Sequence, residues 1–370
     1  MSPAQLNFLQ LRNSDGIIYL DGAAEGLLPE LVLERLNLFT PSDASFFAST
    51  NVRIMKSVGR KFRSVFFLSS LENGLLKIFK HFRINKSLKI LIDPGLPDPM
   101  ANLAECSNQT QVLIPSEKGE LEPSHIPGGI REKHRFVLLN HINPISGTER
   151  NIEDFNQALR VQSETDNKDI FLFVDGSSAF SHGLPMRPCD LYIISFGTIF
   201  GLPGYACFCS DKLHSALAHE VESKTLQDLM DRRIPRLSTH IFAEFSDYLQ
   251  ELREGLIPNM KHPENSVAEM VCYLKDNFPE REDWRIYSFS TERGLVFLEG
   301  PQSQIHELSF QLRDYGIIHS FGTLSEMGFS KLNPPDLHSE KKLFRFSIQW
   351  YNSMDEIRKL CNLLKILIRR

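Results

Sequence analysis

Long apolar segments are missing from this sequence of 370 residues. A helix needs about 20 consecutive apolar residues to cross a bilayer, and no run here approaches that length. The first residues, MSPAQLNFLQLRN, also lack the basic region and apolar stretch of a secretory signal. We therefore expect a soluble, cytoplasmic protein with no membrane partner.

A strong excess of charge of either sign is missing too. The chain has 41 basic and 46 acidic side chains, which leaves a net charge of −5. Nucleic-acid-binding domains usually carry a basic surface, so we expect no nucleic-acid partner. The histidines are dispersed, at positions that include His141, His182, His214 and His319. Because no metal-ligand spacing and no G-x-S-x-G motif occurs, we expect neither a metal site nor a serine nucleophile.

Cysteine is scarce, with six residues scattered along the chain. Small secreted proteins cluster their cysteines, so this distribution argues against a disulfide framework. Cys207 and Cys209 lie two positions apart in GYACFCSD, a segment typical of a strand. Their side chains would then point to the same face. We expect both to be buried, reduced thiols.

Apolar material for a large core is present, because 42% of the residues are hydrophobic and 27 are Phe. Amphipathic stretches such as Asn73–Phe82 and Ile152–Gln162 alternate with short apolar runs. Runs such as FVLLN and IFLFV are apolar throughout, which is typical of parallel strands covered on both faces. We predict strands at Val65–Leu68, Lys89–Ile92, Gln111–Ile114, Arg135–Asn140, Ile170–Val174, Leu191–Ser195 and Tyr205–Cys209.

The pattern changes after a long connecting helix near Phe242–Pro258. We predict helices near Ser266–Asn277, Gln304–Tyr315 and Met354–Arg369, and strands at Arg285–Ser290, Gly294–Leu298 and Leu343–Ile348. The predicted fold class is therefore α/β: a mainly parallel sheet with flanking helices, plus a smaller α+β domain.

Turn residues follow several of the predicted strands. The segments are SSLENG (69–74), NHINPISGT (140–148), VDGSSAFSHG (174–183) and SFGTIFGLPG (195–204). In open α/β sheets, ligands bind at the carboxyl ends of the strands, so we expect a site there. YLDGAAEGLLP (19–29) and FRFSIQWYN (344–352) are further candidates.

Four of these segments together resemble the class V aminotransferases, in particular the cysteine desulfurase and isopenicillin-epimerase-like branch of the fold-type I pyridoxal phosphate (PLP) enzymes. They are YLDGAAEGLLP, VDGSSAF, SFGTIFGLPG and FRFSIQWYN. SFGTIFGLPG is similar to the family's S-x-H-K-x-x-G-P-x-G, and FRFSIQWYN resembles its R-x-S-x-x-x-Y-N. The resemblance implies a large domain at 40–250, a small domain formed by 1–39 with 255–370, and a homodimer.

The largest departure from the family's pattern lies in the third segment. The resemblance places the Schiff-base lysine at Thr198 and the preceding histidine at Gly197. An internal aldimine requires an amine, which a threonine hydroxyl cannot replace. The nearest later lysine, Lys212, lies beyond the next predicted strand. We therefore expect no catalytic residue of the usual kind and no covalently bound cofactor.

Other positions that the resemblance assigns to the cofactor also depart from the pattern. The phosphate loop reads Ser70-Leu71-Glu72. Two like charges about 4 Å apart repel by about 4 kcal/mol at an effective dielectric of about 20, so Glu72 would oppose a phosphate unless it points to solvent. The ring-stacking residue should lie within 92–102, which contains no aromatic residue or histidine. Pro144 stands where a donor to the ring hydroxyl is expected, and Asn143 is the candidate substitute.

Several residues keep the chemistry that the resemblance requires. Asp175 matches the partner of the pyridinium nitrogen, Ser195 and Ser178 offer hydroxyls for a cofactor pocket with Ser70 and Asn143, and Arg345 matches the fork that binds a substrate carboxylate. Structural interpretations stay open for each of them. Asp175 could cap the following turn, Arg345 could pair with an acid, and the serines could bond the local backbone.

Two functions remain after this comparison. The first is a non-catalytic homologue, a scaffold or regulatory protein that keeps the fold without the chemistry. The second is an enzyme that binds PLP or pyridoxamine phosphate (PMP) non-covalently, or takes a small amino or keto acid on Arg345. The substrate and the biological process are not indicated by the sequence.

Overall fold

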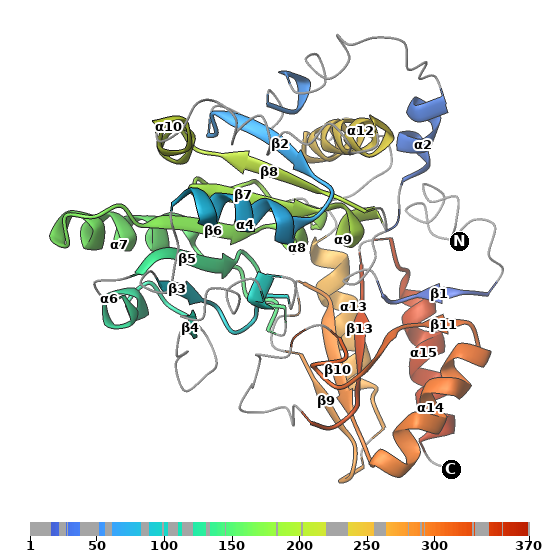
Figure 1. The fold of residues 1–370 in the computed structure, drawn as a ribbon. Helices are drawn as coiled ribbons and strands as arrows, with labels where there is room; N and C mark the ends of the chain where they lie inside the picture. Colours follow the sequence, from blue (N-terminus) through green and yellow to red (C-terminus); the bar gives the residue numbers. More distant parts are fainter. Residues whose placement is uncertain are drawn as a thin grey trace.

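The computed structural model describes residues 16–21, 27, 29–37, 52–55, 61–82, 89–97, 100–102, 110–112, 121–130, 134–144, 146–182, 184–200, 203–219, 236–254, 264–279, 281–288, 291, 293–327, 329, 340–349 and 351–368. A large sheet with helices on both faces forms one part of the molecule, and the C-terminal elements form a second, smaller part beside it (Figure 1).

The large part is built on a seven-stranded sheet, here called the central sheet, with the order β2-β8-β7-β6-β5-β3-β4. Its strands are β2 (Ser64–Leu68), β3 (Lys89–Ile92), β4 (Thr110–Val112), β5 (His134–Asn140), β6 (Phe171–Asp175), β7 (Leu191–Ser195) and β8 (Tyr205–Cys209). All pairs from β4 to β7 are parallel, whereas β8 is antiparallel to both of its neighbours. The predicted mainly parallel sheet is confirmed.

Both faces of the central sheet are covered, which explains the continuous apolar runs of its strands. Along β5, Val137 and Leu139 belong to one core, while Phe136 and Leu138 belong to the core on the opposite face. This alternation follows from the two-residue period of a strand. The first core includes α7 (Ile152–Thr165) and α12 (Arg236–Arg253), and the second includes α4 (Leu71–His81) and α10 (Asp211–His219).

The smaller part, here called the antiparallel unit, is built on a four-stranded sheet with the order β12-β13-β10-β9. It contains β9 (Arg285–Tyr287), β10 (Leu295–Glu299), β12 (Ser320–Gly322), β13 (Leu343–Ser347), α13 (Glu264–Asp276), α14 (Gln302–Asp314) and α15 (Met354–Leu367). A separate core unites these elements. The predicted smaller α+β unit is therefore confirmed.

The N-terminal segment contributes to both parts. Strand β1 (Ile18–Tyr19) pairs in parallel with β11 (Ile317–Ile318), so it joins the antiparallel unit. Helix α2 (Glu30–Asn37) packs instead against α12, with Val32 in a core of the central sheet and Arg35 paired to Glu251 at 2.6 Å. The division into 1–39 with 255–370 and 40–250 stays a prediction.

The two cysteines of β8 are free and fully buried, as predicted for Cys207 and Cys209. Burial raises the pKa of both thiols well above its ordinary value, so they stay protonated. Cys106 lies outside the described residues. Among the helices that the structure describes, none combines the length and the apolar character that a membrane span requires.

A buried ion pair stabilises the carboxyl ends of β3 and β5. Asp93 and Arg150 are 1% and 5–6% exposed, and their side chains are in direct contact. Asp93 also accepts from the Gly95 and Asn140 backbone N–H groups at 2.9 and 3.1 Å, and Arg150 donates to the Asn140 carbonyl at 2.9 Å. Because each charge has several partners, the pair holds the loop after β3 against the loop after β5.

We predict that Arg150→Met destabilises the protein by about 3–5 kcal/mol, because it leaves the carboxylate of Asp93 buried without its cation. Arg358→Met is the control, since Arg358 makes an exposed ion pair with Asp355 at 2.9 Å and its loss should cost about 1 kcal/mol or less. Urea denaturation followed by circular dichroism measures both. Equal losses in the two variants would contradict the structural role assigned to the buried pair.

Candidate functional site

The structure brings several predicted residues together at the carboxyl ends of β5, β6 and β7. Asn140 and Asp175 are register partners, and Asp175 also faces Ile193 of β7. The His141 backbone N–H donates to the Asp175 carbonyl at 2.8 Å, so the loop after β5 begins directly beside the end of β6. This is the sheet edge at which the sequence predicts a site.

Asp175 and Ser195 are linked through a residue that the sequence analysis did not select, Ser177. Asp175 Oδ1 accepts from the Ser177 backbone N–H at 2.9 Å and from its hydroxyl at 2.6 Å. The same hydroxyl oxygen accepts from the Ser195 backbone N–H at 2.8 Å. Ser177 begins the short helix α8 (Ser177–Ser181), so the three residues tie the ends of β6 and β7 together.

The electrostatic surroundings of Asp175 oppose its charge. Burial raises the pKa of this carboxyl group, the two hydrogen bonds from Ser177 lower it, and the nearby carboxylate of Asp93 raises it further. The pKa of Asp175 therefore lies above its ordinary value.

The neighbouring Ser178 is half-buried, and its backbone carbonyl accepts a hydrogen bond from the Ser181 hydroxyl at 2.8 Å.

Thr198 lies in the short helix α9 (Phe196–Phe200), which begins directly after β7. Its side chain is half-buried, and its backbone N–H lies 3.4 Å from the Ser195 hydroxyl. Lys212 is at the opposite end of the sheet, because its ammonium group donates to the carbonyl of Ile170, just before β6, at 2.7 Å. Lys212 therefore cannot serve a group that lies beside Asp175.

The NPISGT loop closes on itself. The Asn143 backbone N–H donates to the Thr148 carbonyl at 3.0 Å, and Asn143 Oδ1 accepts from the Ser146 backbone N–H at 3.2 Å. The loop after β3 lies against Pro144, since a Cβ atom at Gly95 would lie 3.1 Å from Pro144 Cδ. Asn143 is thus engaged in its own turn, and little room remains for a side chain at position 95.

A buried aromatic pair supports the turn at Asp175. Tyr192 of β7 is fully buried, and its hydroxyl lies 2.6 Å from His141 Nδ1. A Cβ atom at Gly176 would lie 1.9 Å from the Tyr192 ring, so only glycine fits above it. Because His141 and Tyr192 are far apart in sequence, no local pattern predicts their contact.

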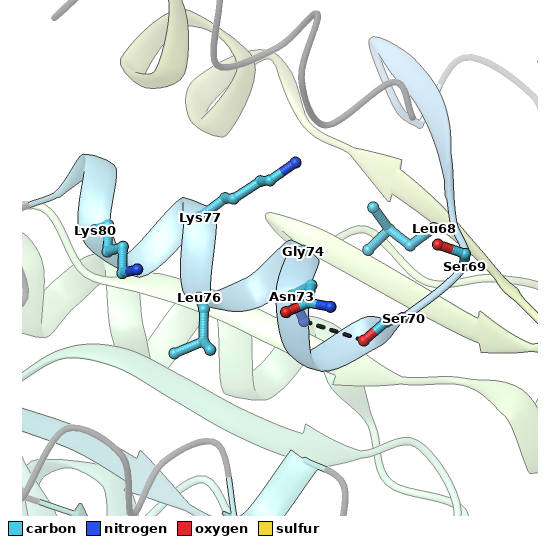
Figure 2. Close-up of a pocket in the computed structure, with 8 residues that line it drawn as sticks. All are labelled: Leu68, Ser69, Ser70, Asn73, Gly74, Leu76, Lys77 and Lys80. Atoms are coloured by element: carbon cyan, nitrogen blue, oxygen red, sulfur yellow. Dashed lines mark hydrogen bonds between the residues drawn. The ribbon is translucent and has the colours of Figure 1, made fainter. Parts of the chain in front are cut away.

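Ser70, the predicted phosphate-loop residue, caps helix α4, where its hydroxyl accepts from the Asn73 backbone N–H at 3.2 Å. Figure 2 shows this bond at the edge of a pocket of about 320 Å³. The pocket is lined by Leu68, Ser69, Ser70, Asn73, Gly74, Leu76, Lys77 and Lys80. Glu72 is exposed and does not line this pocket, so its carboxylate does not face the cavity.

Arg345 lies on β13 of the antiparallel unit and is 5% exposed. Its Nη2 donates to the Ser320 hydroxyl at 3.1 Å and lies 4.0 Å from Asp21 Oδ1, while Ser320 also donates to Asp21. Its Nε is buried, and no partner for it exists among the described residues. Burial lowers the pKa of the guanidinium, and Asp21 raises it. The sequence analysis did not select Asp21, although it lies within the YLDG motif.

The other histidines have local partners. His214 Nδ1 lies 3.2 Å from the Ser64 hydroxyl, and His319 Nε2 lies 3.1 Å from the Ser309 hydroxyl. His182 directly follows α8, and burial together with the charge of Arg293 lowers its pKa to about 4. Within the described part of the chain, no cluster of histidine, cysteine, aspartate or glutamate has the arrangement of a metal site.

Comparison with known proteins finds cysteine desulfurases among the similar proteins. No family model matches the chain. A probable cysteine desulfurase of Haemophilus influenzae is 24% identical over 227 residues, which cover 53% of this chain and 49% of the relative, so the match spans about half of that relative's length. Similar solved structures include the cysteine desulfurase CsdA of Escherichia coli (15% identical, TM-score 0.75, covering 100% of this chain and 99% of the other).

Two further structures agree with that result. The apo cysteine desulfurase of Thermococcus onnurineus is 16% identical with a TM-score of 0.76, over 99% of this chain and 97% of the other. A NifS-like protein of Rickettsia africae is 14% identical with a TM-score of 0.71, over 96% and 100%. At these identities the likeness establishes that the chain has the cysteine desulfurase fold.

We predict that Ser177→Ala destabilises the protein by about 1–3 kcal/mol, because it removes a donor to Asp175 and leaves the Ser195 backbone N–H without its acceptor. Ser178→Ala is the matched control on the same helix and should change stability by about 0.5 kcal/mol or less. Thermal and urea unfolding of both variants measure the difference. A loss no larger for Ser177→Ala than for Ser178→Ala would rule out the link between the strand ends.

Proposed function

We propose that this chain is a non-catalytic homologue of the class V aminotransferases and cysteine desulfurases, with Thr198 in place of the Schiff-base lysine. The observation that carries the proposal is that the strand-end segment aligned with S-x-H-K contains no amine. The chain keeps the cysteine desulfurase fold, and Lys212 is held at the far end of β6. A fold by itself does not guarantee the chemistry of its relatives.

The residues at the strand ends do not fit a covalently held PLP. That cofactor, when bound, supplies an electron sink, and it needs an amine for its attachment. Thr198 offers a hydroxyl, and Pro144 has no hydrogen to donate to a ring oxygen. Asp175 already accepts two hydrogen bonds at Oδ1 and has a raised pKa, which weakens it as the anion opposite a pyridinium. We therefore assign no reaction step to PLP.

A protein of this kind would act through its surface as a scaffold or regulator. We propose that it forms a homodimer, with a large domain at 40–250 and a small domain at 1–39 with 255–370, as the resemblance implies. In fold-type I enzymes the active site lies at the dimer interface, so a non-catalytic homologue would keep the shape of the same dimer. Analytical ultracentrifugation of the full chain tests the dimer.

We predict that the purified protein, incubated with PLP and reduced with borohydride, carries no stoichiometric pyridoxyl adduct on any single side chain by mass spectrometry. It should also release no sulfide from L-cysteine in the presence of PLP, because Thr198 has no amine with which to form the imine. We expect Thr198→Lys to remain without turnover, since Pro144 and the Asp175–Ser177 contact are unchanged.

A cysteine desulfurase of confirmed activity serves as the positive control for both assays. A stoichiometric pyridoxyl adduct on one side chain of the wild-type protein would refute the proposal, as would PLP-dependent sulfide release above the protein-free rate. Adduct formation with Thr198→Lys alone would support the assignment of position 198.

A second function is favoured by the buried Nε of Arg345, which has no partner among the described residues. An unsatisfied buried donor costs about 1–3 kcal/mol, and an arginine fork matches a carboxylate. We propose as the alternative an enzyme that takes an amino or keto acid on Arg345, or that binds PLP or PMP non-covalently through Asp175 and Ser195. Asp21 lies 4.0 Å from the guanidinium and would repel such an anion.

This alternative predicts that millimolar L-alanine, L-cysteine or pyruvate, or micromolar PLP or PMP, raises the melting temperature of the wild-type protein. Arg345→Gln should abolish the shift caused by the amino and keto acids, measured against its own ligand-free melting temperature, and Arg358→Gln should retain it. An unchanged shift in Arg345→Gln would show that the ligand binds elsewhere, and no shift with any of the compounds would leave the scaffold as the function.

A further inference from the structure

Glu149 lies where the antiparallel unit meets the strand ends of the central sheet. It closes the loop that starts at His141, through a bridge with Ile142. Arg293, in the turn before β10, donates from Nη2 to Glu149 Oε2 at 2.9 Å. Arg293 is 6% exposed and the Glu149 side chain is 28% exposed, so this ion pair between the two parts of the molecule is partly buried.

The second oxygen of Glu149 faces a buried imidazole. Glu149 Oε1 lies 3.6 Å from His141 Nε2, a separation too long for a hydrogen bond but within the range of an ion pair when the imidazole is protonated. His141 is fully buried, and its Nε2 makes no hydrogen bond with the described residues. The neighbouring His141, together with Arg293 and Arg187, holds the pKa of Glu149 below its ordinary value against the effect of burial, so the carboxylate is charged at neutral pH.

The imidazole continues the path toward Asp175. His141 Nδ1 lies 2.6 Å from the Tyr192 hydroxyl, and the Tyr192 ring fills the space in which Gly176 would carry a side chain. Gly176 separates Asp175 from Ser177, and its backbone N–H donates to the Ile193 carbonyl at 2.8 Å. A displacement of the Tyr192 ring therefore moves the turn directly above it, because a packed interior has no free volume to absorb the shift.

We propose that Arg293, Glu149, His141 and Tyr192 form a relay through which the antiparallel unit fixes the Asp175–Ser177 turn. Its ends are an ion pair between the two parts and a glycine packed on an aromatic ring. Coupling between sites can be carried by packed side chains and charged groups in contact, and these four side chains supply such contacts. The four side chains of the relay carry no part of the proposed function, although that function refers to the turn which the relay would fix. Amide exchange at this turn and the PLP assays are separate measurements, so either can fail alone.

Other charged groups surround this path. Arg187 lies 3.5 Å from Glu149 Oε1 and 3.4 Å from Glu153 Oε1, but it is 35% exposed and belongs to the segment before β7. His182, at the end of α8, is close enough to Arg293 for that charge to affect it. An experiment on the relay must therefore measure the backbone at Gly176 and Ser177, at the start of α8, rather than at the end of that helix.

Amide hydrogen exchange of the full-length protein, resolved by NMR or overlapping peptides, tests the relay. We expect Arg293→Gln to raise the exchange rates of Gly176 and Ser177 roughly fivefold or more, the lower end of the coupling seen between linked sites. The control is Lys341→Gln, which removes an ion pair with Glu299 at 3.0 Å inside the antiparallel unit and should leave both amides unchanged.

Tyr192→Phe removes the hydroxyl contact with His141 and keeps the ring under Gly176. In this background, the increase caused by Arg293→Gln should fall to less than half. If Arg293→Gln does not fold, Glu149→Gln replaces it with the same expectation. The relay is wrong if exchange at Gly176 and Ser177 stays unchanged, if Lys341→Gln has an equal effect, or if the full increase persists in Tyr192→Phe.

Discussion

Every polar group buried at the carboxyl ends of the central strands needs a partner, and this constraint organises the whole region. Parallel strands covered on both faces end in a protein interior, where an unpaired charge is costly. The chain meets the requirement for two of its carboxylates with its own side chains. Asp93 is held by Arg150, and Asp175 is held by Ser177. The first contact fixes the loop after β3 to the end of β5, and the second ties the end of β6 to the end of β7 through Ser177.

The fold could be predicted from the sequence because its signal is local. Three of the predicted strands, Lys89–Ile92, Leu191–Ser195 and Tyr205–Cys209, have the bounds that the structure gives. A buried parallel strand is apolar along its whole length, so its limits are visible in single residues. The short elements α8, α9 and β11 were not predicted, because five residues or fewer carry too little pattern to separate a helix from a turn.

The partners of the site residues could be predicted only in part. Ser177 directly follows Asp-Gly, and such a sequence favours a side chain that bonds the backbone two residues on, so this contact was within reach. The contacts of Tyr192 with His141 and of Arg345 with Asp21 join residues 51 and 324 positions apart (192 − 141 and 345 − 21). They depend on strand order and on how the antiparallel unit sits beside the central sheet, and no local pattern contains that information.

The available donors and amines bear differently on covalent PLP chemistry and on anion binding. An internal aldimine with PLP needs a reactive amine, and the Thr198 side chain offers none. Anion binding needs only a hydrogen-bond donor that is not already engaged, and the guanidinium of Arg345 has such a donor. Ser320 and Asp21 engage its Nη2, whereas its Nε has no partner among the described residues. Asp21 partly neutralises that guanidinium, so a carboxylate ligand would compete with an internal one. This arrangement supports the proposal that the region around Arg345 is better suited to weak recognition of an anion than the segment at Thr198 is to covalent PLP chemistry.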